Sequence, residues 1–159
     1  MNIENKEDPL FLDEIQKKLE HYCAYQERCH KEVAQKLKEI GVYGIFIDTI
    51  IGKLVEANYL NETRFAESFV RGKFRIKKWG KKRLIRELKI RDISDWNINK
   101  AIDQISEKEY NDKLKNLCEK KIDPREKPSP KLKDKIIRSL TYKGWEIDKV
   151  IKFVNQLTR

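Results

Sequence analysis

The chain has 159 residues, of which 39% are charged and 39% hydrophobic, and it carries a formal net charge of +10. The charged fraction is well above the roughly 25% usual in soluble domains, which favours slender helical units over one thick globule. The longest apolar stretch, residues 41–54, falls short of the ~20 residues that span a bilayer, and the first nine residues are polar and acidic. We therefore expect no membrane segment, no secretory signal and a cytoplasmic location.

The first predicted unit covers residues 10–58. It begins with an amphipathic helix at about residues 13–28, and two further helices follow on either side of a turn at Gly41, where a helix end needs a left-handed residue. The apolar positions of this helical pair are Val33, Leu37, Val42, Ile47, Ile50, Ile51 and Leu54.

The cysteines of the chain are Cys23, Cys29 and Cys118, an odd number without CxxC spacing. This pattern predicts reduced thiols in place of a disulfide framework. His21 and His30 lie near the first two cysteines, but the spacing matches no standard zinc pattern. We therefore expect ordinary helix residues and no metal site.

The apolar pattern of the first unit returns twice, which predicts further units over residues 59–106 and 107–159. At an offset of 51 residues the second copy reads Leu84, Leu88, Ile93, Ile98, Ala101, Ile102 and Ile105. At a further offset of 52 residues the third copy reads Ile136, Leu140, Trp145, Val150, Phe153, Val154 and Leu157. The turn residue is Asp92 in the second copy and Gly144 in the third. An amphipathic segment precedes each copy, at about residues 62–78 and 107–121.

These repeats predict the fold class: an all-α protein, an elongated tandem array of three three-helix repeats with about nine helices. Each unit is too small to bury a large core alone, so neighbouring units should stabilise one another. Residues 122–131 hold three of the four prolines and predict a loop inside the third unit. We expect a monomer, which fits an elongated array.

The excess positive charge is concentrated between Arg71 and Arg91. This segment has eleven Lys and Arg residues and one acidic residue, Glu87, whereas the rest of the chain has 25 residues of each sign. A solvated helix face is the usual explanation of a charge run. Here the run is so unbalanced that it predicts a binding surface for phosphates or for protein carboxylates.

On a helix, the start of this region would form a basic stripe opposite an apolar face. The stripe consists of Arg64, Arg71, Arg75 and Lys78. The apolar face consists of Phe65, Phe69, Gly72 and Ile76. Phe74 and Trp79 interleave with the basic residues, and an exposed aromatic ring there can stack on a nucleic-acid base. Aromatic residues at helical spacing are more often core, so both alternatives stay open.

Residues 59–93 combine a Tyr-Leu pair, an Arg-Phe-Ala helix start and a Gly-x-x-Arg-aliphatic-x-x-Glu-Leu segment. The positions are Tyr59, Leu60, Asn61, Arg64, Phe65, Ala66, Gly80, Arg83, Leu84, Glu87 and Leu88. In this ordered combination the stretch resembles the central repeat of RecX proteins, which consist of tandem three-helix repeats. Asp92 departs from the glycine usual in the family, and the proline-rich loop at residues 124–130 is a second departure.

The resemblance implies a regulatory protein of DNA recombination and repair. Such a protein binds the RecA recombinase filament on DNA in its helical groove and inhibits filament extension, ATP hydrolysis and strand exchange. The expected surface for RecA and DNA is Arg64, Arg71, Lys73, Arg75, Lys77, Lys78, Lys81, Lys82, Arg83 and Arg86. The expected core residues of the same region are Phe65, Phe69, Leu84 and Leu88.

Two other functional classes fit the sequence less well. An enzyme is not expected, because the sequence has no Gly-rich phosphate loop, no HExxH motif, no Ser-His-Asp set and only two histidines, and we expect no cofactor. A stand-alone helix-turn-helix DNA-binding protein would place residues 81–90 in the major groove. Base readout uses a mixed set of Arg, Asn, Gln and Ser, whereas this surface is nearly all Lys and Arg, which favours binding to a filament or to the DNA backbone.

Overall fold

The structure, a computed structural model, describes residues 9–159. In this part of the chain there are nine helices and no strand. The first unit contains α1 (Pro9–Tyr25), α2 (His30–Glu39) and α3 (Ile45–Glu56). The second contains α4 (Glu62–Arg75), α5 (Lys81–Ile90) and α6 (Asp95–Ile102). The third contains α7 (Glu107–Lys121), α8 (Pro130–Tyr142) and α9 (Ile147–Leu157).

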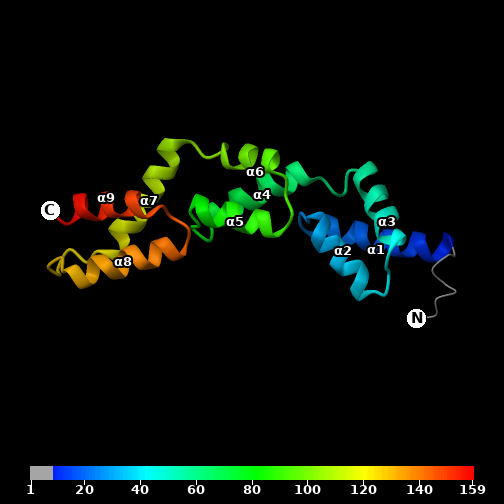
Figure 1. Cartoon of the computed structure of the whole chain (residues 1–159), viewed down its shortest axis with the longest axis horizontal. Coiled ribbons are helices and arrows are strands. Elements are labelled where there is room, and N and C mark those ends of the chain that lie inside the picture. Colours follow the sequence, from blue (N-terminus) through cyan, green and yellow to red (C-terminus); the bar gives the residue numbers. More distant parts are fainter. Residues whose placement is uncertain (1–8) are drawn as a thin grey trace.

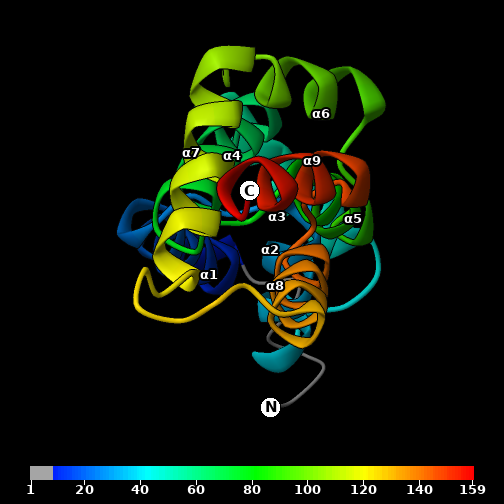
Figure 2. The same cartoon turned by 90° about the vertical axis from the view of Figure 1, so that its left-hand side faces the viewer.

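The three units follow one another along the long axis of the molecule in chain order. Figure 1 shows α1 to α3 at one end, α4 to α6 in the centre and α7 to α9 at the other end. The end-on view of Figure 2 shows the third unit in front of the other two. The predicted all-α class and elongated array of three-helix repeats are confirmed. None of the helices between residues 9 and 159 is both long and apolar enough to cross a membrane.

The second and third helices of each unit are joined by the same turn. Its left-handed residue is Gly41, Asp92 or Gly144, with φ of 92°, 58° and 97°. In each unit the next residue donates its backbone N–H to a carbonyl five residues earlier: Val42 to Leu37, Ile93 to Leu88 and Trp145 to Leu140. The turn predicted from the repeat is therefore present three times, and in the second unit aspartate adopts the conformation that glycine adopts in the others.

Four helices begin at a polar residue whose side-chain oxygen accepts a backbone N–H three residues further on. These N-caps are Asn61 for α4, Ser94 for α6, Ser106 for α7 and Ser129 for α8. Pro130 occupies the first turn of α8, where its missing N–H costs no helix hydrogen bond. The predicted proline-rich loop is thus present between α7 and α8, over residues 122–129.

The buried apolar side chains form two separate cores. The first belongs to the first unit and consists of Ile15, Leu19, Cys23, Val33, Leu37, Val42, Ile47, Ile50, Leu54 and Leu60. The second is larger and runs without a break through the second and third units, where it includes Phe74, Leu84, Tyr110 and Trp145. Cys29 is the first unit's contribution to this second core. The first unit therefore has a core of its own, whereas the second and third units share one core and form a fused pair.

The end of α4 differs from the prediction. The sequence predicts a helix to residue 78, but α4 ends at Arg75, and Lys78 has a positive φ of 62°. Ile76 was expected on the apolar face and is instead 76% exposed, because it follows the last turn of the helix. Phe65, Leu84 and Leu88 are buried as expected, whereas Phe69 is only partly buried and packs on the outside of the core.

Candidate functional site

The basic segment of the second unit, residues 71–91, changes direction at residues 76–80, between α4 and α5. Contacts with the third unit hold this corner in place. The indole N–H of Trp145 donates to the carbonyl of Lys78 at 2.9 Å. The backbone N–H of Gly80 donates to the Lys143 carbonyl at 2.9 Å, and that of Lys82 donates to the Gly144 carbonyl at 3.1 Å. The start of α5 is therefore covered by the loop between α8 and α9.

Tyr110 of α7 completes this corner. Its ring is fully buried and stacks on Trp145, with ring centres 4.6 Å apart. Its hydroxyl accepts the backbone N–H of Lys81 at 3.0 Å and donates to a carboxylate oxygen of Glu146 at 2.5 Å. Burial, with the hydrogen bond to Glu146, raises the pKa of the Tyr110 hydroxyl above its usual range, so it remains a proton donor at neutral pH.

Three of the ten predicted surface residues lie over aromatic rings. The Lys73 ammonium is 5.2 Å from the centre of the Trp79 ring, and the Arg83 guanidinium lies 4.2 Å from the centre of the same ring. The Lys81 ammonium lies 4.6 Å from the Tyr110 ring. These half-buried cations are held in position by cation–π contacts.

Arg64 has a different position from the one expected. Its guanidinium bridges the first two units, because it pairs with Glu27 in the connection between α1 and α2 and donates to the side-chain and backbone oxygens of Asn58. The face that Arg64 shares with Arg71 and Arg75 on α4 is therefore already occupied at one end. Lys78, the predicted fourth member of the stripe, lies beyond the helix and not on it.

The remaining predicted cations are exposed, in two places. On α4, Arg71 donates to Gln104 at 2.9 Å, and Arg75 lies 3.9 Å from Glu109, both near the connection from α6 to α7. On the corner and on α5, the exposed residues are Lys77, Lys82 and Arg86, and they form no ion pair with any described residue. Of the ten predicted residues, Arg64 therefore lies at the junction of the first two units, and four lie partly buried at the end of α4 or the start of α5: Lys73, Lys78, Lys81 and Arg83. The other five are exposed to solvent: Arg71, Arg75, Lys77, Lys82 and Arg86.

The two aromatic residues of the basic segment are not free to stack on a base. Phe74 is buried in the core against Tyr110 and Trp145, as the core alternative expected. Trp79 is partly buried, with Lys73 and Arg83 lying over its ring. This segment therefore presents no exposed ring face on which a base can stack.

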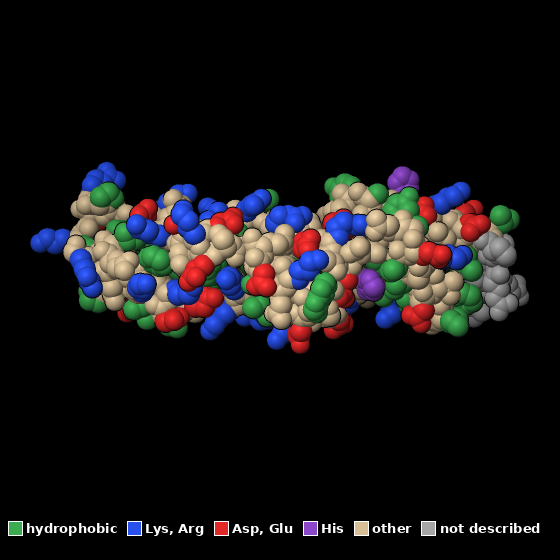
Figure 3. Space-filling view, turned by 90° about the horizontal axis from the view of Figure 1, so that it is seen from above, with side chains coloured by type: hydrophobic (Ala, Val, Ile, Leu, Met, Phe, Trp, Pro, Cys, Tyr) green, Lys and Arg blue, Asp and Glu red, His purple; other side chains and the backbone are tan. Residues whose placement is uncertain are grey.

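A second cluster of cations lies on α8 and is not among the predicted surface residues. Residues 127–143 contain six Lys and Arg residues and one acidic residue, Asp134. Acidic residues outside the third unit, in residues 1–70 and 92–106, offset this excess in a count over the chain, whereas a count over a short window reveals it. Figure 3 shows the molecule from above the view of Figure 1. On the face seen there, Lys and Arg side chains are mixed with Asp and Glu side chains.

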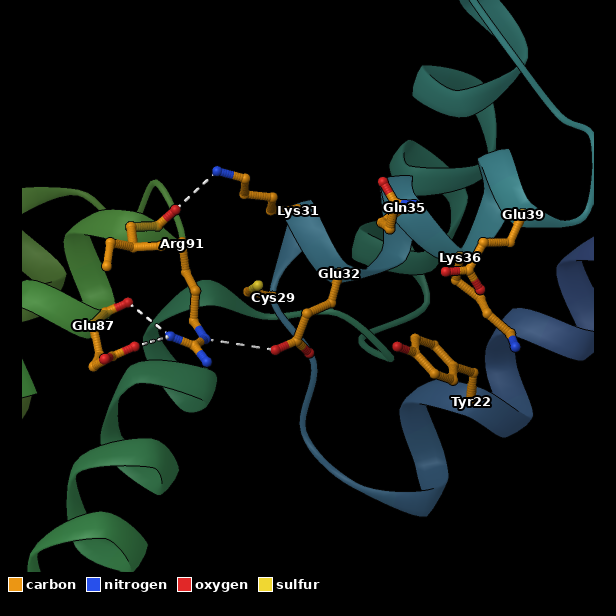
Figure 4. A pocket seen from close by; sticks show the side chains of 10 residues that line it. Tyr22, Cys29, Lys31, Glu32, Gln35, Lys36, Glu39, Glu87 and Arg91 are labelled. Carbon is orange, nitrogen blue, oxygen red and sulfur yellow. Dashed lines mark hydrogen bonds and ion pairs between the residues drawn. The ribbon is translucent and has the colours of Figure 1, made fainter.

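The junction between the first two units is made by side chains. The Lys31 ammonium donates to the Ile90 carbonyl at 2.9 Å, and the Arg91 guanidinium lies 3.7 Å from Glu32 and 3.0 Å from Glu87 (Figure 4). A pocket of about 430 Å³ opens beside these residues. Its lining carries charges of both signs, so it attracts neither anions nor cations in particular.

No group of three or more His, Cys, Asp or Glu residues between residues 9 and 159 stands together as a metal site. Cys23, Cys29 and Cys118 are buried free thiols. Burial raises the pKa of Cys23 and of Cys118 to about 11. The thiols therefore stay protonated at neutral pH, where a protonated thiol is a poor nucleophile.

Known proteins resemble this chain in sequence and in fold. A family model described as the second three-helix domain of RecX matches residues 61–102. A "Regulatory protein RecX" from Oceanobacillus iheyensis is 28% identical over 138 residues, which are 86% of this chain and 51% of that protein. One from Bacillus licheniformis is 32% identical over 133 residues, which are 83% of this chain and 51% of that protein. The chain thus spans about half the length of these curated relatives.

A solved structure extends the similarity to the whole fold. The crystal structure of RecX from Lactobacillus salivarius aligns with a TM-score of 0.78 and 27% identity, over 92% of this chain and 96% of that one. With its repeated three-helix units, its matched second domain and these relatives, the chain belongs to the RecX family.

Proposed function

We propose that this protein binds the RecA recombinase filament on DNA, lying in its helical groove, and inhibits filament extension, ATP hydrolysis and strand exchange. It carries no catalytic chemistry in this proposal. The observation that carries the proposal is the set of exposed cations without ion-pair partners on the corner and on α5, Lys77, Lys82 and Arg86. These residues stand on an elongated array, and the family name of the relatives supports a regulatory role.

An elongated array suits a repetitive partner. A filament offers the same surface at every subunit, so several weak contacts along one array add to a large effective affinity. Lys and Arg side chains are suited to phosphates and to carboxylates alike, and both are available where protein and DNA meet in a filament. A monomer is sufficient for this arrangement, because three units in one chain already provide the multivalency.

The alternative, a stand-alone helix-turn-helix protein that reads base sequence, has less support. In such proteins the N-terminal residues of the recognition helix enter the major groove. Here the N-terminal turn of α5 is bonded to the third unit through Gly80 and Lys82. The exposed residues further along α5 are Arg86, Lys89 and Ile90, which offer no amide or hydroxyl group for base readout.

The test is the rate of ATP hydrolysis by the cognate RecA on single-stranded DNA, measured at fixed salt as the protein is titrated in. We expect inhibition below one molecule per RecA subunit. The variant Lys82→Glu/Arg86→Glu should need at least about tenfold more protein for the same inhibition, since two charge-assisted contacts become repulsive. Lys17→Glu/Lys18→Glu on exposed positions of α1 makes the same charge change and should inhibit like the parent protein.

Two results would count against the proposal. Full ATPase activity at excess protein would remove RecA inhibition from it. Equal inhibition by all three proteins would remove α5 from the contact surface.

A further inference from the structure

We infer that the exposed face of α8, with the loop that follows it, is a second binding groove, whose ligand is single-stranded DNA and whose stacking residue is Tyr142. The inference deepens the proposed function, and it rests on that function for the choice of DNA over other polynucleotides. It concerns a different helix and a different unit from the α5 surface.

The groove is a hollow of about 650 Å³ on one side of α8. Its lining consists of Lys131, Lys135, Arg138, Ser139, Tyr142 and Lys143. Four of these six residues are cationic, none is acidic, and the one acidic residue of α8, Asp134, lines a neighbouring hollow instead. The side chains of the four cations form no ion pair and no hydrogen bond with any described residue.

Tyr142 supplies the ring face that the basic segment of the second unit lacks. Tyr142 is 75% exposed, whereas Phe74 is buried and Trp79 is partly buried against the core, between Lys73 and Arg83. A flat exposed ring among unpaired cations is the combination by which proteins bind single strands, since bases stack on the ring while Lys and Arg contact phosphates. A duplex presents phosphates but no free base face, and an acidic protein surface has no need of the ring.

Arg83 links this groove to the surface of the second unit. Its guanidinium lies 4.2 Å from the centre of the Trp79 ring and 5.4 Å from the centre of the Tyr142 ring. Tyr142 is thereby placed where the second unit ends and the third begins. A strand that stacks on Tyr142 can continue along the cations of α8 in one direction and toward α5 in the other.

The experiment measures binding of the full chain, without RecA, to a fluorescein-labelled oligo(dT) and to a labelled duplex of equal length, by anisotropy. Tyr142→Ala should raise the Kd for oligo(dT) about tenfold, as expected for the loss of one stacked base, and should leave the Kd for the duplex unchanged. Tyr142→Phe keeps the ring and should bind like the parent protein. Tyr25→Ala removes a tyrosine that is 84% exposed in the first unit and is the matched control.

The cations are tested by salt dependence. Lys135→Glu/Arg138→Glu should weaken oligo(dT) binding and should lower the slope of log Kd against log salt by about 1.4, two phosphate contacts at ~0.7 each. An unchanged oligo(dT) affinity for Tyr142→Ala would overturn the inference. If only Lys82→Glu/Arg86→Glu then impairs RecA inhibition, the proposed function stands without this groove. If Tyr142→Ala loses oligo(dT) binding while RecA is not inhibited by the parent protein, the groove stands and the proposed function falls.

Discussion

The backbone of Gly80 lies so close to that of Gly144 that a Cβ atom built on Gly80 would stand 2.4 Å from the Gly144 carbonyl oxygen. Gly144 in turn faces α5, where its own Cβ would lie 2.3 Å from the Cβ of Arg83. Two chain segments that are 64 residues apart therefore meet through bare backbone, and the hydrogen bonds from Gly80 and Lys82 depend on that approach.

Gly80→Ala should therefore weaken the contact between the second and third units. The methyl group meets backbone atoms, which move less easily than a flexible side chain, so we expect a loss of about 1–3 kcal/mol in the free energy of unfolding. Gly72→Ala is the matched control, because nothing lies within 4 Å of its Cβ and the residue is inside α4. It should stabilise the protein by up to about 1 kcal/mol. Urea unfolding followed by circular dichroism measures both, and equal stability of the two variants would contradict the close contact.

Unfolding should occur in two steps, because the first unit has its own core. All three tryptophans, Trp79, Trp96 and Trp145, belong to the second and third units, so their fluorescence reports only on the fused pair. Circular dichroism reports on every helix. We expect the dichroism of the smaller first unit to be lost at lower urea than the tryptophan signal. Superimposable curves from the two probes would show that the array unfolds as one body.

Tyr110→Phe tests the hydrogen bonds at the buried corner. The variant keeps the stacked ring but leaves the Lys81 N–H without its acceptor and the Glu146 carboxylate without its donor. We expect a loss of about 1–3 kcal/mol in the free energy of unfolding, because both groups are left partly desolvated. Tyr25→Phe removes an exposed hydroxyl and should change the stability by less than about 0.5 kcal/mol. A Tyr110→Phe variant as stable as the parent would mean that water replaces the hydroxyl.

Stability should fall in alkaline solution. The pKa of Cys23 and of Cys118 is raised by burial from an ordinary value of 9.0 to about 11 in the folded protein. Between these values the unfolded chain has lost thiol protons that the folded chain still holds. Stability is therefore fully present below pH 9 and decreases as the pH rises toward 11. The raised pKa of Tyr110 acts in the same direction.

The measurement is the urea midpoint as a function of pH across this interval. Cys118→Ala should show a shallower decrease than the parent, since one of the contributing thiols is gone. The same slope in both proteins would mean that Cys118 ionises equally in the folded and unfolded chain.

The fold was predictable because its signals are local and repeated. The apolar period of each helical pair and a left-handed residue at Gly41, Asp92 and Gly144 recur at nearly constant spacing, so three copies support one another. The end of α4 was not predictable in this way. Ile76 continues the helical period, but the chain leaves the helix so that the carbonyl of Lys78 meets the indole of Trp145, which is 67 residues away.

The candidate site was predictable only in part, for a related reason. Exposure of Lys82 and Arg86 follows from the helical period, because each lies two residues before a buried leucine, Leu84 or Leu88, and so on the opposite side of α5. The pairing of Arg64 with Glu27 joins residues from two units, and no local pattern announces it. The excess of cations around Tyr142 does not appear in a charge count over the whole chain, but a count over residues 127–143 alone shows it.

The two junctions of the array should differ in their sensitivity to dissolved salt. Counterions weaken the half-exposed ion pairs of Arg91 and Lys31 that join the first unit to the second, whereas the apolar core shared by the second and third units is unaffected by screening. At low ionic strength we therefore expect the first unit to be held more firmly against the second. As salt rises this junction should loosen before the other one, so ionic strength should set how freely the first unit moves relative to the second and third.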